Sequence, residues 1–217
     1  MCWNQYVSIN TFLFSTFVLL LIFINNKYSN YKIQLFDSIY AYIFMMSFLT
    51  MQLIEFFLWR NLNNKLLNRI FSTLGQLLLF IQPITSLMLI KEIPLRNKML
   101  LTYSIPAFSY FIYELNKKEF KTNVAKNGHL KWDWLDLDNG YNRVFFLFWL
   151  FFLLFSLFVN KHYLGLSYTI ALLIITYYSY NSLGTFGTLW CWSVNSFMLY
   201  FAFELLVLLP FREHGIC

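Results

Sequence analysis

The sequence predicts an all-α membrane protein: a seven-helix transmembrane bundle with a β-hairpin in the loop between spans four and five. Of its 217 residues, 59% are hydrophobic and only 12% are charged, whereas a soluble domain carries about 25% charged residues. Lipid must therefore cover much of the surface, and only helices or a closed barrel then satisfy the backbone. The apolar runs are long and unbroken rather than alternating in polarity, which favours helices.

Apolar runs long enough to span a membrane recur along the whole chain. We therefore interpret residues 1–217 as one transmembrane domain. A span needs roughly 20 apolar residues. The apolar stretch from residue 144 to residue 180 would form a helix of about 55 Å, so the polar segment 160–162 is expected to split it. The predicted spans are 6–24, 36–59, 67–90, 99–113, 144–160, 163–180 and 186–208. The first lacks a basic segment and a small-residue cleavage site, so we expect it to be retained.

One long polar loop, residues 114–143, separates the fourth and fifth predicted spans. Within it, Asn127-Gly128 is a two-residue turn signal of the type I′ kind. After this turn, apolar residues alternate with polar ones, which is strand periodicity. The apolar positions are Leu130, Trp132 and Trp134. We therefore expect a hairpin over about 119–135, on the side of the membrane that holds the N-terminus (side N). It must pack on helix ends, because an isolated hairpin is marginal in water.

The basic residues give two opposing signals for orientation. With seven spans, side N carries nine Lys and Arg, six of them in the 114–143 loop, whereas the other side carries seven, with at least one in every loop and in the tail. Cytoplasmic loops are normally rich in Lys and Arg. The larger number of basic residues on side N favours a cytoplasmic side N. The presence of a basic residue in every loop of the other side favours the reverse. We follow the second signal and expect a non-cytoplasmic N-terminus.

The distribution of Lys and Arg also indicates which partners to expect. The net charge is +6, but the basic residues are scattered among loops, and nucleic-acid binding needs a basic patch on a folded surface. The expected partners are the lipid bilayer and a small-molecule or ion ligand, not nucleic acid. The oligomeric state is left open.

Tryptophans are distributed unevenly across the predicted topology. All seven lie on side N, although interfacial tryptophans normally mark both membrane surfaces. One interpretation is an aromatic belt that is denser on one face. The other is a tryptophan-lined cavity open to side N, because aromatic walls suit ligand pockets. The candidate wall residues are Trp132, Trp134, Trp190 and Trp192.

Polar side chains within the spans gather in the same half of the membrane. Gln52 and Glu55 share one face of the second span, while Gln76 and Asn195 lie in the matching halves of the third and seventh. A carboxyl group in a membrane is costly and usually faces the bundle interior. Two hypotheses follow: a structural polar cluster that joins helices, or a site for a proton, a cation or a substrate.

The cysteines and histidines indicate no metal chemistry. No CxxC or zinc-ligand spacing is present and the three histidines are far apart in the sequence, so we expect no metal and no cofactor. Cys2 and Cys191 both belong near side N. If that side faces an oxidising compartment, they form the one internal disulfide that the topology allows.

Three short stretches resemble a known family: Met1-Cys2-Trp3-Asn4, the segment 55–59 and Trp190-Cys191-Trp192. They are similar to an uncharacterised multi-pass (seven-span) membrane protein family of large DNA viruses and unicellular eukaryotes. The resemblance implies a membrane location and a bundle fold. It implies no activity, so no catalytic residue is carried over from it.

These observations favour a non-enzymatic function: small-molecule binding, sensing or transport through a polar-aromatic cavity on side N. A lipid-modifying membrane enzyme is the second hypothesis, although no nucleophile–base pair is visible. A structural protein of a virus-derived membrane is the third. A wide cavity that reaches Glu55 would favour binding. A Cys–His or Glu–His contact in a cavity would favour the enzyme, and a closed polar cluster the structural protein.

Overall fold

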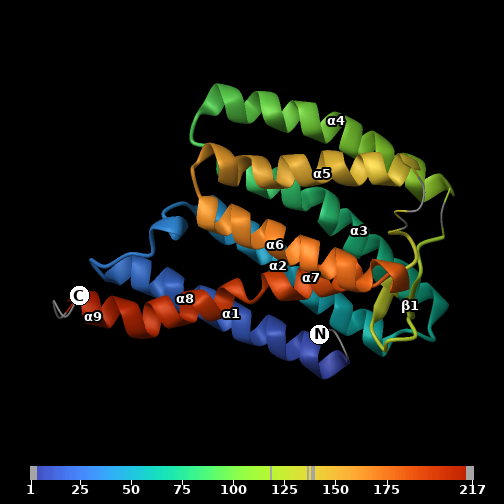
Figure 1. Cartoon of the computed structure of the whole chain (residues 1–217), viewed down its shortest axis with the longest axis horizontal. Helices are drawn as coiled ribbons and strands as arrows, with labels where there is room; N and C mark the ends of the chain where they lie inside the picture. Colours follow the sequence, from blue (N-terminus) through green and yellow to red (C-terminus); the bar gives the residue numbers. More distant parts are fainter. Residues whose placement is uncertain (1–3, 118, 136, 138–139, 214–217) are drawn as a thin grey trace.

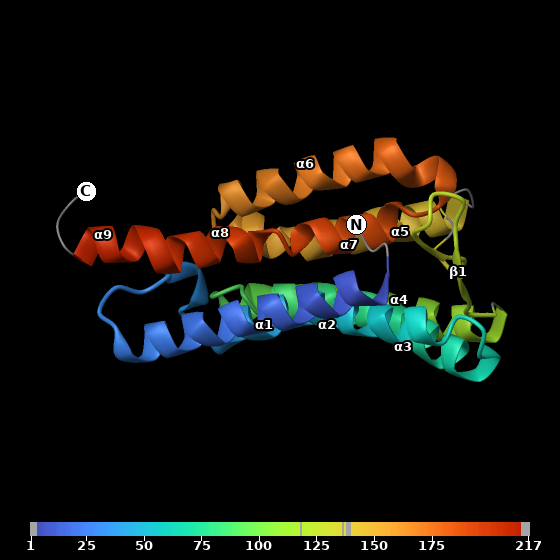
Figure 2. The same cartoon turned by 90° about the horizontal axis from the view of Figure 1, so that it is seen from below.

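The computed structural model describes residues 4–117, 119–135, 137 and 140–213. Its helices lie side by side along one long axis (Figure 1). They form two layers, with α1 to α4 in one and α5 to α9 in the other (Figure 2). The helices are α1 (Gln5–Tyr28), α2 (Ile39–Arg60), α3 (Lys65–Leu87), α4 (Ile93–Lys117), α5 (Gly140–Val159), α6 (Tyr163–Tyr180), α7 (Phe186–Val194), α8 (Phe197–Phe203) and α9 (Leu209–Glu213). Short 3₁₀ turns precede α2 (Gln34–Phe36) and α7 (Asn181–Leu183), and a π-helical turn (Glu204–Leu208) joins α8 to α9.

Five helical segments in the described part of the chain are long and apolar enough to cross a membrane. They are α1, α2, α3, α5 and the continuous C-terminal segment Phe186–Phe211. The prediction of a helical membrane protein is confirmed to this extent. The helix α4 begins at residue 93, ahead of the predicted 99, so the polar residues Arg96 and Lys98 lie in its first turns.

The predicted hairpin is present between α4 and α5. Strands β1 (Thr122–Val124) and β2 (Leu130–Trp132) are antiparallel, and Thr122 lies opposite Trp132. The turn differs from the prediction, since a type I′ turn needs positive φ at both central residues. Here Gly128 has φ 78°, and the only non-glycine residue with positive φ in the described chain is Lys161. The loop is therefore a three-residue turn that ends in a left-handed glycine.

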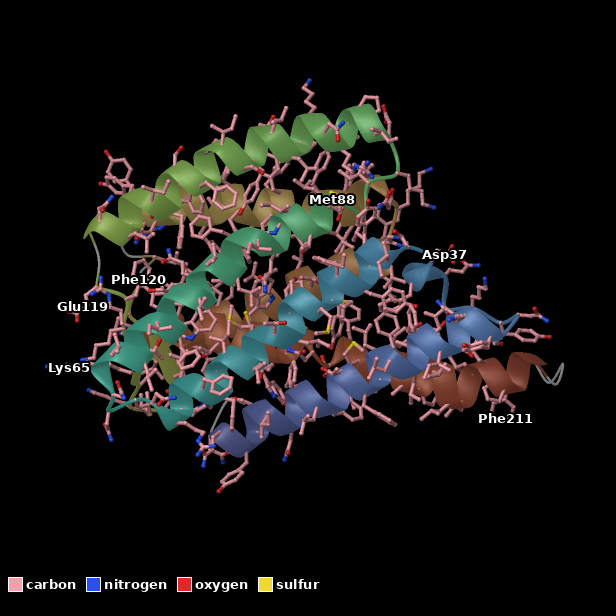
Figure 3. All side chains as sticks on the ribbon, turned by 180° about the vertical axis from the view of Figure 1, so that it is seen from behind. Asp37, Lys65, Met88, Glu119, Phe120 and Phe211 are labelled. Carbon is pink, nitrogen blue, oxygen red and sulfur yellow. The ribbon has the colours of Figure 1, made fainter. Side chains whose placement is uncertain are left out.

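The bundle has two ends, which we call the hairpin end and the far end. In Figure 3, Lys65 at the start of α3 and Glu119, just after α4, lie on one side of the view, whereas Met88 at the end of α3 and Asp37 lie toward the other side, which is the far end. The side chain of Asn160, after α5, donates to the Leu89 carbonyl at 3.0 Å, so the α5–α6 turn is also at the far end. Both α4 and α6 consequently connect the far end to the hairpin end.

Aromatic rings and hydroxyl groups hold the layers together. This glycine-poor chain has few small residues for close helix approach. Instead, the Ser86 hydroxyl lies 2.6 Å from that of Ser156, which joins α3 to α5. The Tyr103 hydroxyl donates to the Phe80 carbonyl at 3.0 Å, which joins α4 to α3. The largest hydrophobic cluster surrounds α3, α5, α7 and the hairpin.

Candidate functional site

A cavity of about 60 Å³ lies beneath the hairpin, between α3, α4, α5 and α7. Its aromatic wall includes four tryptophans from three elements: Trp132, Trp134, Trp149 and Trp190. Its polar lining consists of Gln76, Tyr110, Glu114, Asn142 and Cys191. The structure thus brings four of the predicted site residues together: Gln76, Trp132, Trp134 and Trp190.

The hairpin covers this cavity with a stacked pair of indoles. The rings of Trp132 and Trp134 are 4.9 Å apart and nearly parallel, at 8°. A glycine gives the first indole room, since a Cβ at Gly187 would lie 3.2 Å from the Trp132 ring. A Cβ at Gly75 would make an ordinary contact with the Trp134 ring, at 3.7 Å. Both indoles are 3% exposed. Burial of these two rings is the packing that an otherwise marginal hairpin needs.

The opposite wall is built from Trp149 of α5 and Trp190 of α7, whose rings meet edge to face at 5.6 Å. The Trp149 Nε1 donates to the Leu79 carbonyl at 2.6 Å. Leu79 lies four residues before Pro83 within α3, and proline has no N–H to offer that carbonyl. The indole therefore takes the place of a missing helix hydrogen bond and fixes the wall to α3.

Three buried polar atoms that belong to cavity-lining residues have no hydrogen-bond partner among the described residues. They are Oε1 of Gln76 and the Nε1 atoms of Trp132 and Trp134. Buried polar atoms in folded proteins are nearly always satisfied by protein, water or ligand. One acceptor and two donors of the lining residues therefore lack a partner within the described part of the chain.

The polar residues on the α4 and α5 side of the cavity were not predicted from the sequence. Tyr110 donates from its hydroxyl to Oδ1 of Asn142 at 2.6 Å, and it also interacts with the Glu114 carboxyl group. Glu114 is 3% exposed. The available signal was the spacing of Tyr110 and Glu114, which are four residues apart and so share a helix face, but Glu114 was assigned to the loop.

The other predicted ligand-binding residues, Gln52, Glu55, Trp192 and Asn195, are not among the residues that line the cavity. Gln52 and Glu55 on α2 are fully buried, and Asn195 is 4% exposed. Glu55 is near enough to act electrostatically on Cys191, which does line the cavity. The Asn195 side chain donates to the carbonyl of Cys191 at 2.7 Å, while the Trp192 Nε1 donates to the Thr11 hydroxyl on α1 at 3.2 Å.

Cysteine and metal chemistry were also part of the sequence hypotheses. Cys191 is buried on α7, whereas Cys2 lies outside the described residues, so the Cys2–Cys191 disulfide stays a prediction. Within residues 4–117, 119–135, 137 and 140–213, no group of three or more His, Cys, Asp or Glu is arranged to hold a metal ion.

Comparison with protein-family models, with curated proteins and with solved structures finds no match to this chain. The resemblance to the family of large DNA viruses and unicellular eukaryotes therefore stays a prediction.

Proposed function

We propose that the chain is a seven-span integral membrane protein with the hairpin and the N-terminus on one, non-cytoplasmic side. Five segments qualify as spans by composition, and α4 and α6 connect the same two ends of the bundle. The 18 residues of α6 extend about 27 Å, close to the hydrocarbon thickness of a bilayer. Both helices carry exposed apolar side chains, as lipid contact requires: Leu101, Ile105, Phe108 and Ile112 on α4, and Leu164, Ile170, Ile174 and Ile175 on α6.

Cysteine labelling tests this topology. In a cysteine-free background, Asn4→Cys and Lys126→Cys should react with a membrane-impermeant maleimide from one side, and Lys161→Cys only from the other. If α4 and α6 did not cross, the pattern would invert: Lys126→Cys would react from the side opposite to Asn4→Cys. Comparing only the two chain ends would not discriminate, because five and seven spans both place them on opposite sides.

We propose further that the tryptophan-walled cavity binds a small, polar, uncharged molecule, without chemical conversion. The unpartnered polar atoms of Gln76, Trp132 and Trp134 carry this proposal, because a ligand with both a donor and an acceptor would satisfy them. The volume of about 60 Å³ is far below the roughly 300–1,000 Å³ of sites for drug-sized ligands. The ligand class is therefore that of a primary amide or a short alcohol.

Ligand-observed NMR on the purified protein in micelles, with acetamide as the probe, tests the cavity. Gln76→Leu should weaken acetamide binding about tenfold, because a buried partner is lost. Trp59→Phe is the matched control: it removes an indole at the end of α2 that is not among the cavity-lining residues. Equal binding by the parent and Gln76→Leu would mean that acetamide binds without Gln76 and would contradict the proposed site. No binding by either protein would mean that water alone fills the cavity.

A structural membrane protein is the second candidate. Two observations favour it: the cavity is small, at about 60 Å³, and Glu55 is not among its lining residues. In that case Gln52, Glu55 and Asn195 serve only to join α2 to α7. The failure of every small-ligand probe, together with normal folding, is the result that would favour this candidate.

A further inference from the structure

A second and larger cavity of about 510 Å³ lies at the far end of the bundle, between α2, α5, α6 and α8. Its volume falls in the range of small-molecule sites, roughly 300–1,000 Å³. Its floor is apolar and includes Phe44, Phe48, Leu153, Leu157, Phe197 and Phe201. Such an apolar floor favours contact with a hydrocarbon chain.

Among the charged residues that line this cavity, the basic ones outnumber the acidic one. Lys32, Lys161 and His162 line it and are exposed. Partial burial and the nearby Lys91 lower the pKa of His162 from its usual 6.5, so at pH 7 His162 is neutral and offers a hydrogen bond. Glu204 also lines the cavity and opposes the lysines, which leaves one net positive charge.

Lys161 has a backbone conformation that favours glycine. Its φ is 60°, and the next amide, that of His162, donates back to the Leu157 carbonyl at 2.8 Å. This is the helix-ending arrangement in which glycine normally occupies the left-handed position. A lysine here costs conformational energy, and strain of this kind concentrates at functional sites. What the lysine adds over glycine is a charge at the cavity.

We propose that the far-end cavity holds one acyl chain of a lipid, with the anionic oxygens of its headgroup on Lys32, Lys161 and His162. The apolar floor matches the acyl chain, and the side chains of Lys32, Lys161 and His162 match the anionic headgroup. A fatty-acid carboxylate and a phospholipid phosphate share this chemistry. The site rests on the chain lying in a membrane and is independent of the cavity beneath the hairpin.

Native mass spectrometry of the full chain, released from micelles, measures this binding with three probes: dioleoylphosphatidylglycerol, dioleoylphosphatidylcholine and oleate. At least one anionic probe should bind about tenfold more tightly than the zwitterionic lipid. Retention of phosphatidylglycerol alone assigns a phospholipid, and retention of oleate alone assigns a fatty acid. Equal retention of all three probes would overturn the proposal.

Lys161→Gly separates folding from binding. Glycine suits the left-handed position, so this variant should unfold at the same temperature as the parent or at a higher one. Its affinity for the anionic probe should nonetheless fall about tenfold, through loss of one charge-assisted contact. Lys126→Gly removes the same charge at the hairpin end and should leave binding unchanged. Equal loss in both variants would indicate a nonspecific charge effect and contradict the site.

Two further variants make opposite predictions. Gly165 lines the cavity, and a Cβ there would have no atom within 4 Å, so Gly165→Leu adds a side chain that starts in open space and should block the acyl chain. Glu204→Gln removes the opposing charge and should tighten anion binding several-fold. Unchanged binding in Gly165→Leu, or weaker binding in Glu204→Gln, would place the lipid outside this cavity.

Discussion

Replacing Asn68 with alanine is expected to lower the free energy of unfolding by about 2–4 kcal/mol, because two buried backbone groups each lose their partner. The Asn68 side chain donates to the Thr122 carbonyl and accepts from the Thr122 amide, both at 2.9 Å. The side-chain amide of Asn68 thus pairs with the outer edge of β1, as the backbone of a neighbouring strand would. Asn68 is 2% exposed and Thr122 is fully buried, so water cannot readily replace the lost bonds.

Equilibrium unfolding in mixed micelles measures this cost, and hydrogen exchange localises it to the hairpin. Asn64→Ala is the matched control: its side chain accepts from the Leu67 amide at the start of α3, a helix cap worth about 1 kcal/mol. If hairpin amides in Asn68→Ala stayed as protected as in the parent, the anchoring role of Asn68 would be wrong.

The hairpin illustrates how far sequence reasoning reaches. Alternation of Leu130, Trp132 and Trp134 places these three residues on one buried face, because strand side chains alternate. That face is observed. Its contact surface could not be predicted, because Gly75 and Gly187 approach the indoles from helices that are distant in sequence. No local pattern marks a helical glycine as the place where a ring will lie.

The cavity wall shows a second limit. Trp190 and Trp192 are two residues apart on α7 and so do not share a helix face; Trp190 lines the cavity, and Trp192 bonds to α1. Helix geometry alone could have separated them. Gln52 and Glu55 were correctly expected to be buried. The sequence does not show, however, whether a buried side chain contacts another side chain or lines a cavity. Packing decides that.

Trp149→Phe should lower the free energy of unfolding by about 2–4 kcal/mol, because the Leu79 carbonyl loses its donor while the ring becomes smaller. The physical cause can be isolated, since that carbonyl lacks a helix partner only through Pro83. In Pro83→Ala, the new alanine N–H can donate to Leu79. The same Trp149→Phe change in this background should cost about 1–2 kcal/mol less, a coupling in the range seen for residues that share a partner.

Four unfolding measurements complete this cycle: the parent, each single variant and the double variant. Loss of ring volume and of the edge contact with Trp190 occurs in both backgrounds and therefore cancels, so the coupling reports the Leu79 carbonyl alone. A coupling near zero would mean that the indole N–H, 2.6 Å from that carbonyl, does not replace the missing helix bond. A coupling of the expected size would show that a proline in α3 and a tryptophan in α5 act as one unit, which holds the wall of the cavity against the helix that the proline interrupts.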